Sequence, residues 1–466
     1  MSVRISPWWP SAILGALVLR LWIMPLPSSF WTDETGTAFI VHHGARAWAG
    51  VPWSIYYVLP RLAESIGGFS EVTYRIPSLL AMGMALWTIA RLAARLIHPD
   101  AAWLAAFACL ILRGFDFQAA DARPYALGTC AASLAMWFLV RWLDTGRWRN
   151  AILFVLFAAL LWPIQPVYAP FYLVFAIYAV TRKGAVSWMQ IAGVFALLAA
   201  ALTPGIVQIP ALAGNASTHV ISEVPGPREL IYSLQLGLVL GCAAAAWLLA
   251  LVVRQSGATL TRSALLLIAL WWLLDPLFLF AFSRMTGISL FVPRYYSLAL
   301  PGAALAASAL AYRFLPANRM KPAAVVLGLI ALATLGNWRT LWPPHANMDW
   351  RGAAAAINRA APDASTPIIC PSPFIEAQAP TPLPSILYAP LDVYPIRGRI
   401  YPFPFRSSPE ADRIAAVLPA SATRFFIYGH KINAPLWENW YRNRLSGWTS
   451  RRLGSFGDVV LIQFDR

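Results

Sequence analysis

Two adjacent carboxylates, Asp33 and Glu34, follow two aromatic residues in the segment Phe30-Trp31-Thr32-Asp33-Glu34-Thr35. A partly buried carboxylate beneath aromatic rings is suited to act as a general base, which accepts the proton of an attacking hydroxyl group. Acidic residues are also common in the first turn of a helix, where they cap backbone N–H groups. The segment therefore indicates either a catalytic base or the cap of a helix from Thr35 to Trp48.

Two further clusters combine arginine with tyrosine, in the segments Asp121-Ala122-Arg123-Pro124-Tyr125 and Arg294-Tyr295-Tyr296. A guanidinium group presents a planar fork of donors that matches phosphate, so Arg123 and Arg294 are candidate phosphate ligands. Asp121 could position an acceptor. The alternatives are a local ion pair between Asp121 and Arg123, and an interfacial arginine within a tyrosine belt.

Metal-binding patterns are weak in this sequence. His42 and His43 are adjacent, and neighbours on a helix diverge by about 100°, so they do not form a pair on one helix face, although one of them could still be a ligand. The sequence contains no Cys or His set with zinc spacing, no phosphate-binding glycine loop with lysine and no G-x-S-x-G motif. No cofactor is therefore certain, and a divalent metal ion could bind.

The composition indicates where these residues are held. Hydrophobic residues make up 59% of the 466 residues and charged residues only 12%, against about 45–50% and 25% in soluble domains. The apolar residues occur in long runs, so the lipid bilayer must surround most of the chain. This excludes a cytosolic enzyme, a disordered chain and a disulfide scaffold. The net charge of +16 comes from dispersed arginines, which exclude a nucleic-acid binder.

A membrane-spanning helix needs about 20 mostly apolar residues, and the sequence predicts about eleven such spans. They lie near 8–25, 77–97, 100–118, 124–142, 151–165, 167–181, 187–207, 231–253, 264–282, 295–314 and 323–342. Arg20 and Asp275 fall inside spans, where charge is costly, so each is expected to face the bundle interior with a structural partner.

Charge asymmetry predicts the orientation of these spans. With the N-terminus inside, most basic loops are cytoplasmic and only Asp100 and Asp144 join them, in accordance with the positive-inside rule. The predicted location is the plasma (inner) membrane, with multiple passes. The clusters at Asp33, Asp121 and Arg294 are then extracytoplasmic, as is the C-terminal domain.

The predicted domains are a transmembrane domain at 1–342, with external surface helices within 26–76, and an extracytoplasmic α/β domain at 343–466. The surface helices are expected in the stretches Thr37–Trp48 and Pro52–Ile66. The C-terminal domain is expected to contain a helix at Asp349–Ala361 and strands at Pro367–Cys370, Arg424–Tyr428 and Asp458–Phe464.

The combined pattern resembles the membrane-embedded C-type glycosyltransferases, in particular the protein O-mannosyltransferases and lipid A aminoarabinose transferases. The similar segments are Trp31-Thr32-Asp33-Glu34, Gly68 to Ser78, Ala122-Arg123-Pro124-Tyr125 with Asp121 where Glu is usual, Arg294-Tyr295-Tyr296 with Pro301, and Asp349-Trp350-Arg351. The chain departs from the family where relatives carry H-P-P-x-Y-Y, because it has Val51-Pro52-Trp53-Ser54-Ile55-Tyr56-Tyr57.

This resemblance implies an inverting transfer of a hexose or pentose from a polyprenyl phosphate donor to a hydroxyl group on a protein, lipid or glycan. It implies that Asp33 is the base, with Glu34 and Asp121 beside it in the catalytic set. The resemblance further implies that Arg75, Arg123, Arg294 and Tyr295 bind the donor phosphate. The alternative functions are a transporter or flippase for lipid-linked sugars and a non-catalytic assembly subunit.

Overall fold

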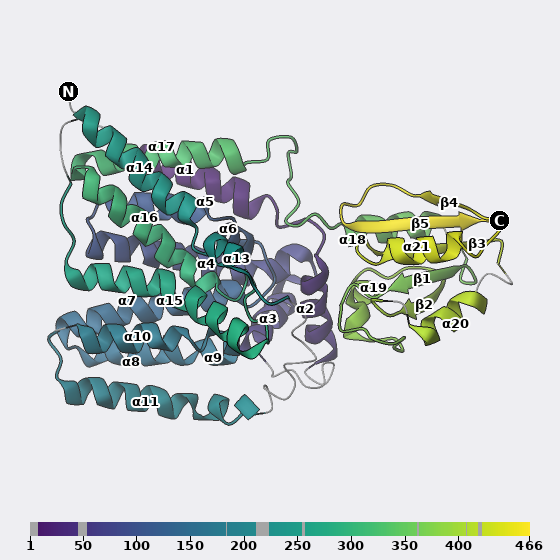
Figure 1. Ribbon diagram of the computed structural model, residues 1–466, viewed down its shortest axis with the longest axis horizontal. Helices are drawn as coiled ribbons and strands as arrows, with labels where there is room; N and C mark the ends of the chain where they lie inside the picture. Colours follow the sequence, from purple (N-terminus) through teal and green to yellow (C-terminus); the bar gives the residue numbers. More distant parts are fainter. Residues whose placement is uncertain are drawn as a thin grey trace. The chain divides into compact units, whose positions relative to one another are not determined.

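The computed structural model (Figure 1) describes residues 8–44, 54–182, 184–210, 223–253, 257–360, 363–406, 408–417 and 422–466. Its internal contacts divide the chain into two compact units. The first unit contains residues 1–26, 52–59 and 75–342, and the second contains 27–51, 60–74 and 343–466. The ends of the two expected surface stretches, 45–48 and 52–53, lie outside the described residues, as does the Val51–Trp53 part of the departing motif.

The first unit is helical. Its elements are α1 (Trp8–Val18), η1 (Leu19–Ile23), η3 (Ile55–Tyr57), α4 (Glu71–Leu96, whose first turn belongs to the second unit), α5 (Ala101–Ile111), α6 (Arg113–Ala119), α7 (Tyr125–Thr145), α8 (Trp148–Ala159), α9 (Leu161–Ile164), η4 (Pro166–Tyr168), α10 (Phe171–Thr181), α11 (Trp188–Ile206), α13 (Pro227–Ser233), α14 (Leu236–Val253), α15 (Arg262–Thr286), η5 (Ser297–Ala299), α16 (Leu300–Phe314) and α17 (Ala317–Leu335).

Each of the eleven expected spans coincides with a helix or with a pair of helices. Among the described residues, five helices are long and apolar enough to cross a membrane, or up to seven if each of two bent pairs forms one span. Three shorter apolar helices accompany them, Trp8–Ile23, Trp148–Ile164 and Pro166–Thr181. Within the described residues, five to seven of the expected spans are thus long helices or bent pairs, and three more are shorter apolar helices. One bend, of 83°, separates α5 from α6, because Leu112 adopts an extended conformation between them.

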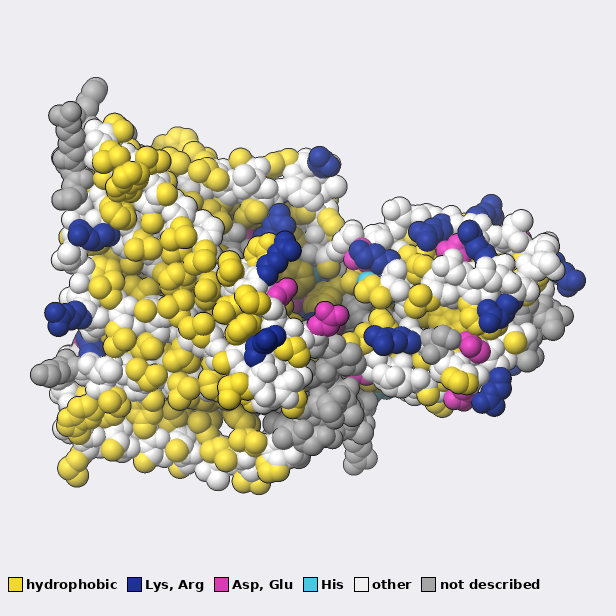
Figure 2. Space-filling model, in the orientation of Figure 1, with side chains coloured by type: hydrophobic (Ala, Val, Ile, Leu, Met, Phe, Trp, Pro, Cys, Tyr) yellow, Lys and Arg dark blue, Asp and Glu magenta, His cyan; other side chains and the backbone are white. Residues whose placement is uncertain are grey.

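Apolar side chains cover the face of the helical unit seen in Figure 2, whereas Lys and Arg are spread over the α/β part of the chain. Exposed examples on the helices are Trp87, Leu156 and Leu248. An apolar surface of this extent is not stable in water, because soluble proteins rarely expose apolar patches larger than a few hundred Å². The chain is a multi-pass helical membrane protein with a C-terminal α/β region, and the predicted fold class is confirmed.

Small residues allow the helices to pack closely, as they do in membrane proteins generally. Helix α16 is rich in alanine and packs against α5, α14 and α15. At Gly302 the approach to α15 is so close that a Cβ atom would lie 2.4 Å from the backbone nitrogen of Trp272. Only glycine fits at this position. Gly302 therefore determines which face of α16 can pack against α15.

Arg20 and Asp275 differ in their surroundings. The buried Arg20 guanidinium donates hydrogen bonds to the carbonyl oxygens of Gly336, Asn337, Thr340 and Leu341, at and beyond the end of α17. It therefore satisfies the carbonyl group of the helix C-cap, Gly336, and fixes the segment that follows α17. Asp275 is fully buried in α15, but within the described part of the chain neither carboxylate oxygen has a hydrogen-bond partner. The expected structural partner is thus found for Arg20 only.

The second unit contains two helices of the first loop, α2 (Thr32–His43) and α3 (Val58–Gly67). Nine residues of α2 are buried, and α2 packs against α19 (Ala389–Val393). A Cβ atom at Gly36 would lie 3.7 Å from the Phe374 ring, so this helix and the C-terminal region are in direct contact. Helix α3 exposes Leu62 and Ile66 and is strongly amphipathic, as expected for a surface helix.

The C-terminal part of the second unit is built on a five-stranded mixed sheet in the order β2-β1-β3-β5-β4. Its strands are β1 (Pro367–Pro371), β2 (Arg399–Phe403), β3 (Arg424–His430), β4 (Thr449–Arg452) and β5 (Val459–Asp465). Strand β1 pairs in parallel with β2 and β3, and β5 pairs antiparallel with β3 and β4. The helices are α18 (Trp350–Ala360), α19, α20 (Pro409–Val417) and α21 (Ala434–Arg442).

The predicted helix from Asp349 corresponds to α18, and the three predicted strands correspond to β1, β3 and β5. These strands are apolar and largely buried; Ile369, Ile427 and Ile462 belong to one core together with Trp437 of α21. The sequence did not reveal β2 and β4. Both are short edge strands: β4 is polar throughout, and β2 contains Pro402, a residue that is rare inside strands.

Candidate active site

Glu34 lies in the first turn of α2 and is fully buried. Its Oε2 atom accepts a hydrogen bond from the backbone N–H of Trp31 at 3.2 Å. This is the helix-cap role that the sequence left open for the acid pair, and the negative charge also suits the positive end of the helix dipole. Glu34 therefore holds the start of α2 in place.

Asp33 precedes Glu34 by one residue and is only partly buried. Neighbouring residues on a helix diverge by about 100°, so the two carboxylates point in different directions. The structure thus separates the acid pair into a buried cap at Glu34 and a more accessible carboxylate at Asp33. Accessibility to a hydroxyl-bearing molecule is the property that a general base requires.

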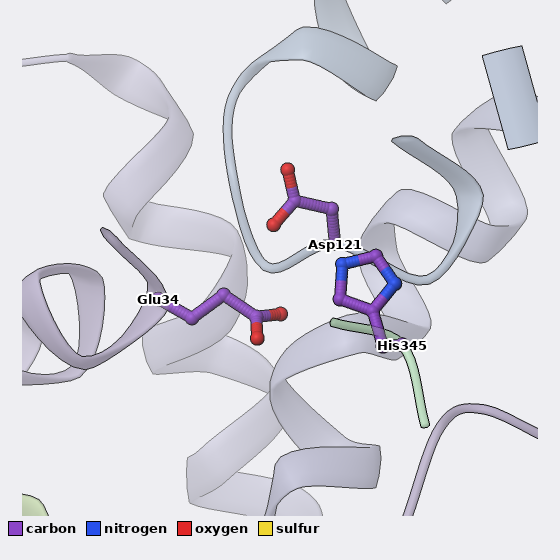
Figure 3. Close-up of side chains that lie close together, drawn as sticks. All are labelled: Glu34, Asp121 and His345. Carbon is purple, nitrogen blue, oxygen red and sulfur yellow. The ribbon is translucent and has the colours of Figure 1, made fainter. Parts of the chain in front are cut away.

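His345 lies beside Glu34 in the second unit (Figure 3). A carboxylate oxygen of Glu34 and a ring nitrogen of His345 are within 4.8 Å of each other. Carboxylate oxygen and imidazole nitrogen are both zinc ligands, so these two side chains could hold a divalent cation. The backbone N–H of His345 donates to Ser28 Oγ at 3.0 Å, which fixes this residue against the loop before α2.

Sequence reasoning missed His345. It follows Pro343-Pro344 directly after the last expected span and lies four residues before Asp349, but it is a single histidine without any ligand spacing. Its position at the junction between the helices and the C-terminal domain is the one signal that could have drawn attention to it.

His42 and His43 were the histidines that the sequence singled out. They end α2 and contact different acids: His42 Nε2 lies 3.2 Å from Glu64 Oε1, and His43 Nε2 lies 3.0 Å from Asp392 Oδ1. The predicted divergence of their side chains is confirmed. Each connects α2 to another part of the second unit, α3 in one case and α19 in the other.

Arg75 lies in α4 and is fully buried in the first unit. Its Nη1 atom donates to the carbonyl oxygen of Leu26 at 2.8 Å and of Pro25 at 3.3 Å. Arg75 therefore supports the turn that follows η1, a structural role that the sequence did not predict. The partner is a loop about 50 residues away, so no local pattern announces it.

Asp121, Arg123 and Tyr125 lie at the start of α7, also in the first unit (Figure 3 labels Asp121). Asp121 is buried, and its backbone carbonyl accepts from the N–H of Arg123 at 2.8 Å, which forms a tight turn. The partly buried Arg123 guanidinium lies over the Tyr125 ring, with 5.8 Å from Cζ to the ring centroid.

A second arginine–tyrosine pair has the same geometry. The Arg294 guanidinium lies over the Tyr295 ring at 5.6 Å, immediately before η5 and α16. The short helix η5, which begins two residues after Tyr295, packs against α7, which begins at Tyr125. The structure brings together two clusters separated by about 170 residues, and it holds both guanidinium groups by stacking on aromatic rings.

The fold is similar to the crystal structure of ArnT from Cupriavidus metallidurans in the apo state, with a TM-score of 0.59 at 12% sequence identity over 98% of this chain and 97% of that chain. This chain has the fold of the C-type glycosyltransferases. Residues 52–207 match the family model described as dolichyl-phosphate-mannose-protein mannosyltransferase, so the family resemblance predicted from the sequence is confirmed.

A second C-type glycosyltransferase structure is also similar, ArnT from Cupriavidus metallidurans bound to undecaprenyl phosphate. The TM-score is 0.54 at 11% identity, over 98% of both chains. No curated protein sequence matches this chain. The family to which these comparisons point uses polyprenyl phosphate sugars, and they leave the sugar and its acceptor open.

Proposed function

We propose that this protein transfers a sugar from a polyprenyl phosphate donor to a hydroxyl-bearing acceptor, with inversion at the anomeric carbon. The observation that supports the proposal is the pair of arginine–tyrosine stacks before α7 and η5, two elements that pack against each other, because two guanidinium groups can together bind a phosphate. Undecaprenyl phosphate is a ligand of the similar ArnT structure, which supports a donor of this class.

Asp33 is the base in this proposal. The acceptor hydroxyl oxygen attacks the anomeric carbon of the donor and forms the new glycosidic bond, while the bond from that carbon to the phosphate oxygen breaks. The hydroxyl proton passes to the Asp33 carboxylate, and the bond electrons leave with polyprenyl phosphate. Phosphate is a stable anion, so the reaction needs no acid for the leaving group, and cations that neutralise its developing charge are sufficient.

Arg123 and Arg294 supply these cations, and Tyr295 fixes the orientation of Arg294. Arg75 supports the same site by holding the turn after η1, and Asp121 orients the segment that carries Arg123. Glu34 orients Asp33 through the helix cap.

A divalent cation on Glu34 and His345 could further polarise the acceptor hydroxyl. The reaction takes place on the extracytoplasmic side, where the charge asymmetry of the loops puts both clusters, and the C-terminal domain helps to position the acceptor.

The test is a reaction of the purified protein, reconstituted in lipid bilayers, with a panel of polyprenyl phosphate hexoses and pentoses and a panel of hydroxyl-bearing acceptors. Release of polyprenyl phosphate and NMR of the anomeric proton of the product measure transfer and inversion. We expect at least one donor to be consumed by the wild-type chain and spared by Asp33→Asn. Movement of labelled donor between leaflets without any sugar transfer would show that the protein is a flippase and would refute the proposed enzyme activity.

A further inference from the structure

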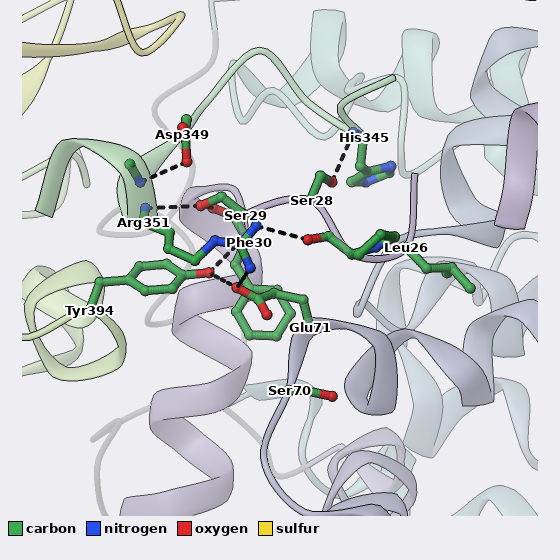
Figure 4. Close-up of polar contacts among 12 residues, drawn as sticks. Leu26, Ser28, Ser29, Phe30, Ser70, Glu71, His345, Asp349, Arg351 and Tyr394 are labelled. Atoms are coloured by element: carbon green, nitrogen blue, oxygen red, sulfur yellow. Dashed lines mark hydrogen bonds and ion pairs between the residues drawn. The ribbon is translucent and has the colours of Figure 1, made fainter. Parts of the chain in front are cut away.

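The loop before α2, residues 27–30, is held by hydrogen bonds with residues more than 300 positions later in the chain (Figure 4). Arg351 donates from Nη2 to the carbonyl oxygen of Pro27 at 2.9 Å and from its backbone N–H to Ser29 Oγ at 3.2 Å. The Phe30 N–H donates to the hydroxyl of Tyr394 at 2.9 Å. With the bond from His345 to Ser28, every residue of this loop has a partner in the C-terminal region.

Glu71, the first residue of α4, joins these contacts into one network. Its Oε1 atom accepts a hydrogen bond from the Tyr394 hydroxyl at 2.7 Å and forms an ion pair with Arg351 Nη1 at 3.1 Å. Tyr394 thus accepts from Phe30 and donates to Glu71 through one oxygen atom. All of these residues belong to the second unit.

The network is largely shielded from water, although the Arg351 side chain is half exposed. The Phe30 side chain is fully buried, Tyr394 is 8% exposed and the Glu71 side chain is 13% exposed. Burial and the nearby Glu71 charge raise the pKa of Tyr394, so its hydroxyl keeps its proton and can donate to Glu71. Buried hydrogen bonds to a charged group are stronger than exposed ones and define a single geometry.

We propose that Glu71, Tyr394 and Arg351 are positioning residues that set the direction of the Asp33 carboxylate. The argument rests on the proposed function, in which Asp33 is the base. Residues 27–30 lead directly into α2, so a displacement of Phe30 moves the first turn of α2, which carries Asp33. None of the three residues carries out chemistry itself; they fix where the base lies, and a misplacement of about 1 Å can cost about 10²-fold in rate.

The decisive variant is Tyr394→Phe in the full-length protein, because it removes one oxygen atom and with it both hydrogen bonds. We expect kcat to fall at least about tenfold, with the KM for the donor changed less than about twofold, since the phosphate-binding arginines are untouched. Amide hydrogen exchange at Phe30 should become faster, which reports the loop independently of activity.

The matched control is Tyr388→Phe. Tyr388 is buried in the same domain, and its hydroxyl donates to the carbonyl oxygen of Phe403 at 2.7 Å, a residue outside the loop at 27–30. This variant loses a buried hydrogen bond but should retain the wild-type kcat. Glu71→Gln keeps an oxygen that can accept from Tyr394, so its kcat should lie between those of the wild type and Glu71→Ala.

An equal fall of kcat in Tyr394→Phe and Tyr388→Phe would overturn the inference, because it would reflect general destabilisation. A wild-type kcat in Tyr394→Phe, with Asp33→Asn inactive, would also overturn it while the proposed function stands. If the wild-type chain transfers no sugar from any donor of the panel, the proposed function fails first and the inference falls with it.

Discussion

Replacement of Asp33 by Asn tests the assignment of the base most directly. The amide has nearly the same shape as the carboxylate but cannot accept a proton at neutral pH. General bases contribute about 10²–10⁴-fold to rate, which corresponds to about 2.7–5.5 kcal/mol of transition-state stabilisation. Asp33 is partly buried in the first turn of α2, so the loss of its charge should lower the free energy of unfolding by about 0.3–1 kcal/mol, as for other acids at a helix N-terminus.

Glu34→Gln provides the contrasting case. Glu34 is fully buried and accepts the Trp31 N–H at 3.2 Å, and the Gln side chain keeps an oxygen that can accept the same bond. The variant loses a negative charge at a helix N-terminus. Such a charge stabilises a helix by about 0.3–1 kcal/mol. We therefore expect the melting temperature of Glu34→Gln to be lower than that of the wild type. Its loss of kcat should be smaller than that of Asp33→Asn.

Both variants are measured by single-turnover transfer with a saturating polyprenyl phosphate sugar, and by thermal unfolding of the same samples. Donor binding is followed separately by native mass spectrometry and should be retained in both. A wild-type rate for Asp33→Asn together with an inactive Glu34→Gln would reverse the roles of the two acids. Wild-type rates for both would refute the catalytic assignment of this loop.

Three further predictions concern other parts of the molecule. Arg123→Lys and Arg294→Lys should each weaken donor binding by about tenfold, because lysine keeps the charge but loses the planar fork and its stacking; unchanged affinity for undecaprenyl phosphate in both variants would refute this. Gly302→Ala should destabilise the helical unit by about 1–3 kcal/mol, because the methyl group would overlap the Trp272 backbone, and this is measurable as a fall in melting temperature. Burial lowers the pKa of His430 below its unfolded value of about 6.5, so below that pH the unfolded chain binds more protons and stability should fall as the pH is lowered from 7 to 5, less steeply in His430→Gln.

The helical unit could be predicted because its signal is local. Apolar runs of the length of a bilayer specify helices whatever their partners are, and each expected span coincides with helical structure. The bends could not be placed, because the break at Leu112 depends on packing around it. In the C-terminal domain, the buried strands were apparent from their apolar sequences, whereas the edge strands β2 and β4 are specified by the strands beside them.

The candidate site was predictable in part for the same reason. Asp33, Glu34 and the two arginine–tyrosine segments form short patterns that can be read without a structure. His345, Tyr394 and the carbonyl partners of Arg75 cannot be found in this way, because each acts on a residue distant in the chain. The lack of a hydrogen-bond partner for Asp275 in the described residues is likewise a property of the packed helices and not of its sequence neighbours.

The hydrogen bonds from Arg351 to residues 27 and 29 join positions 324 and 322 residues apart, so the loop before α2 leaves the ribosome long before its partners do. Throughout insertion of the intervening helices, this loop has no support from the C-terminal region. Closure of such long-range contacts is slow compared with helix formation, and it cannot begin before Arg351 and Tyr394 have been translated. A nascent chain or one that ends early would therefore lack the hydrogen bonds that hold residues 27–30, and the order of translation would keep an unfinished chain from acting on lipid-linked sugars.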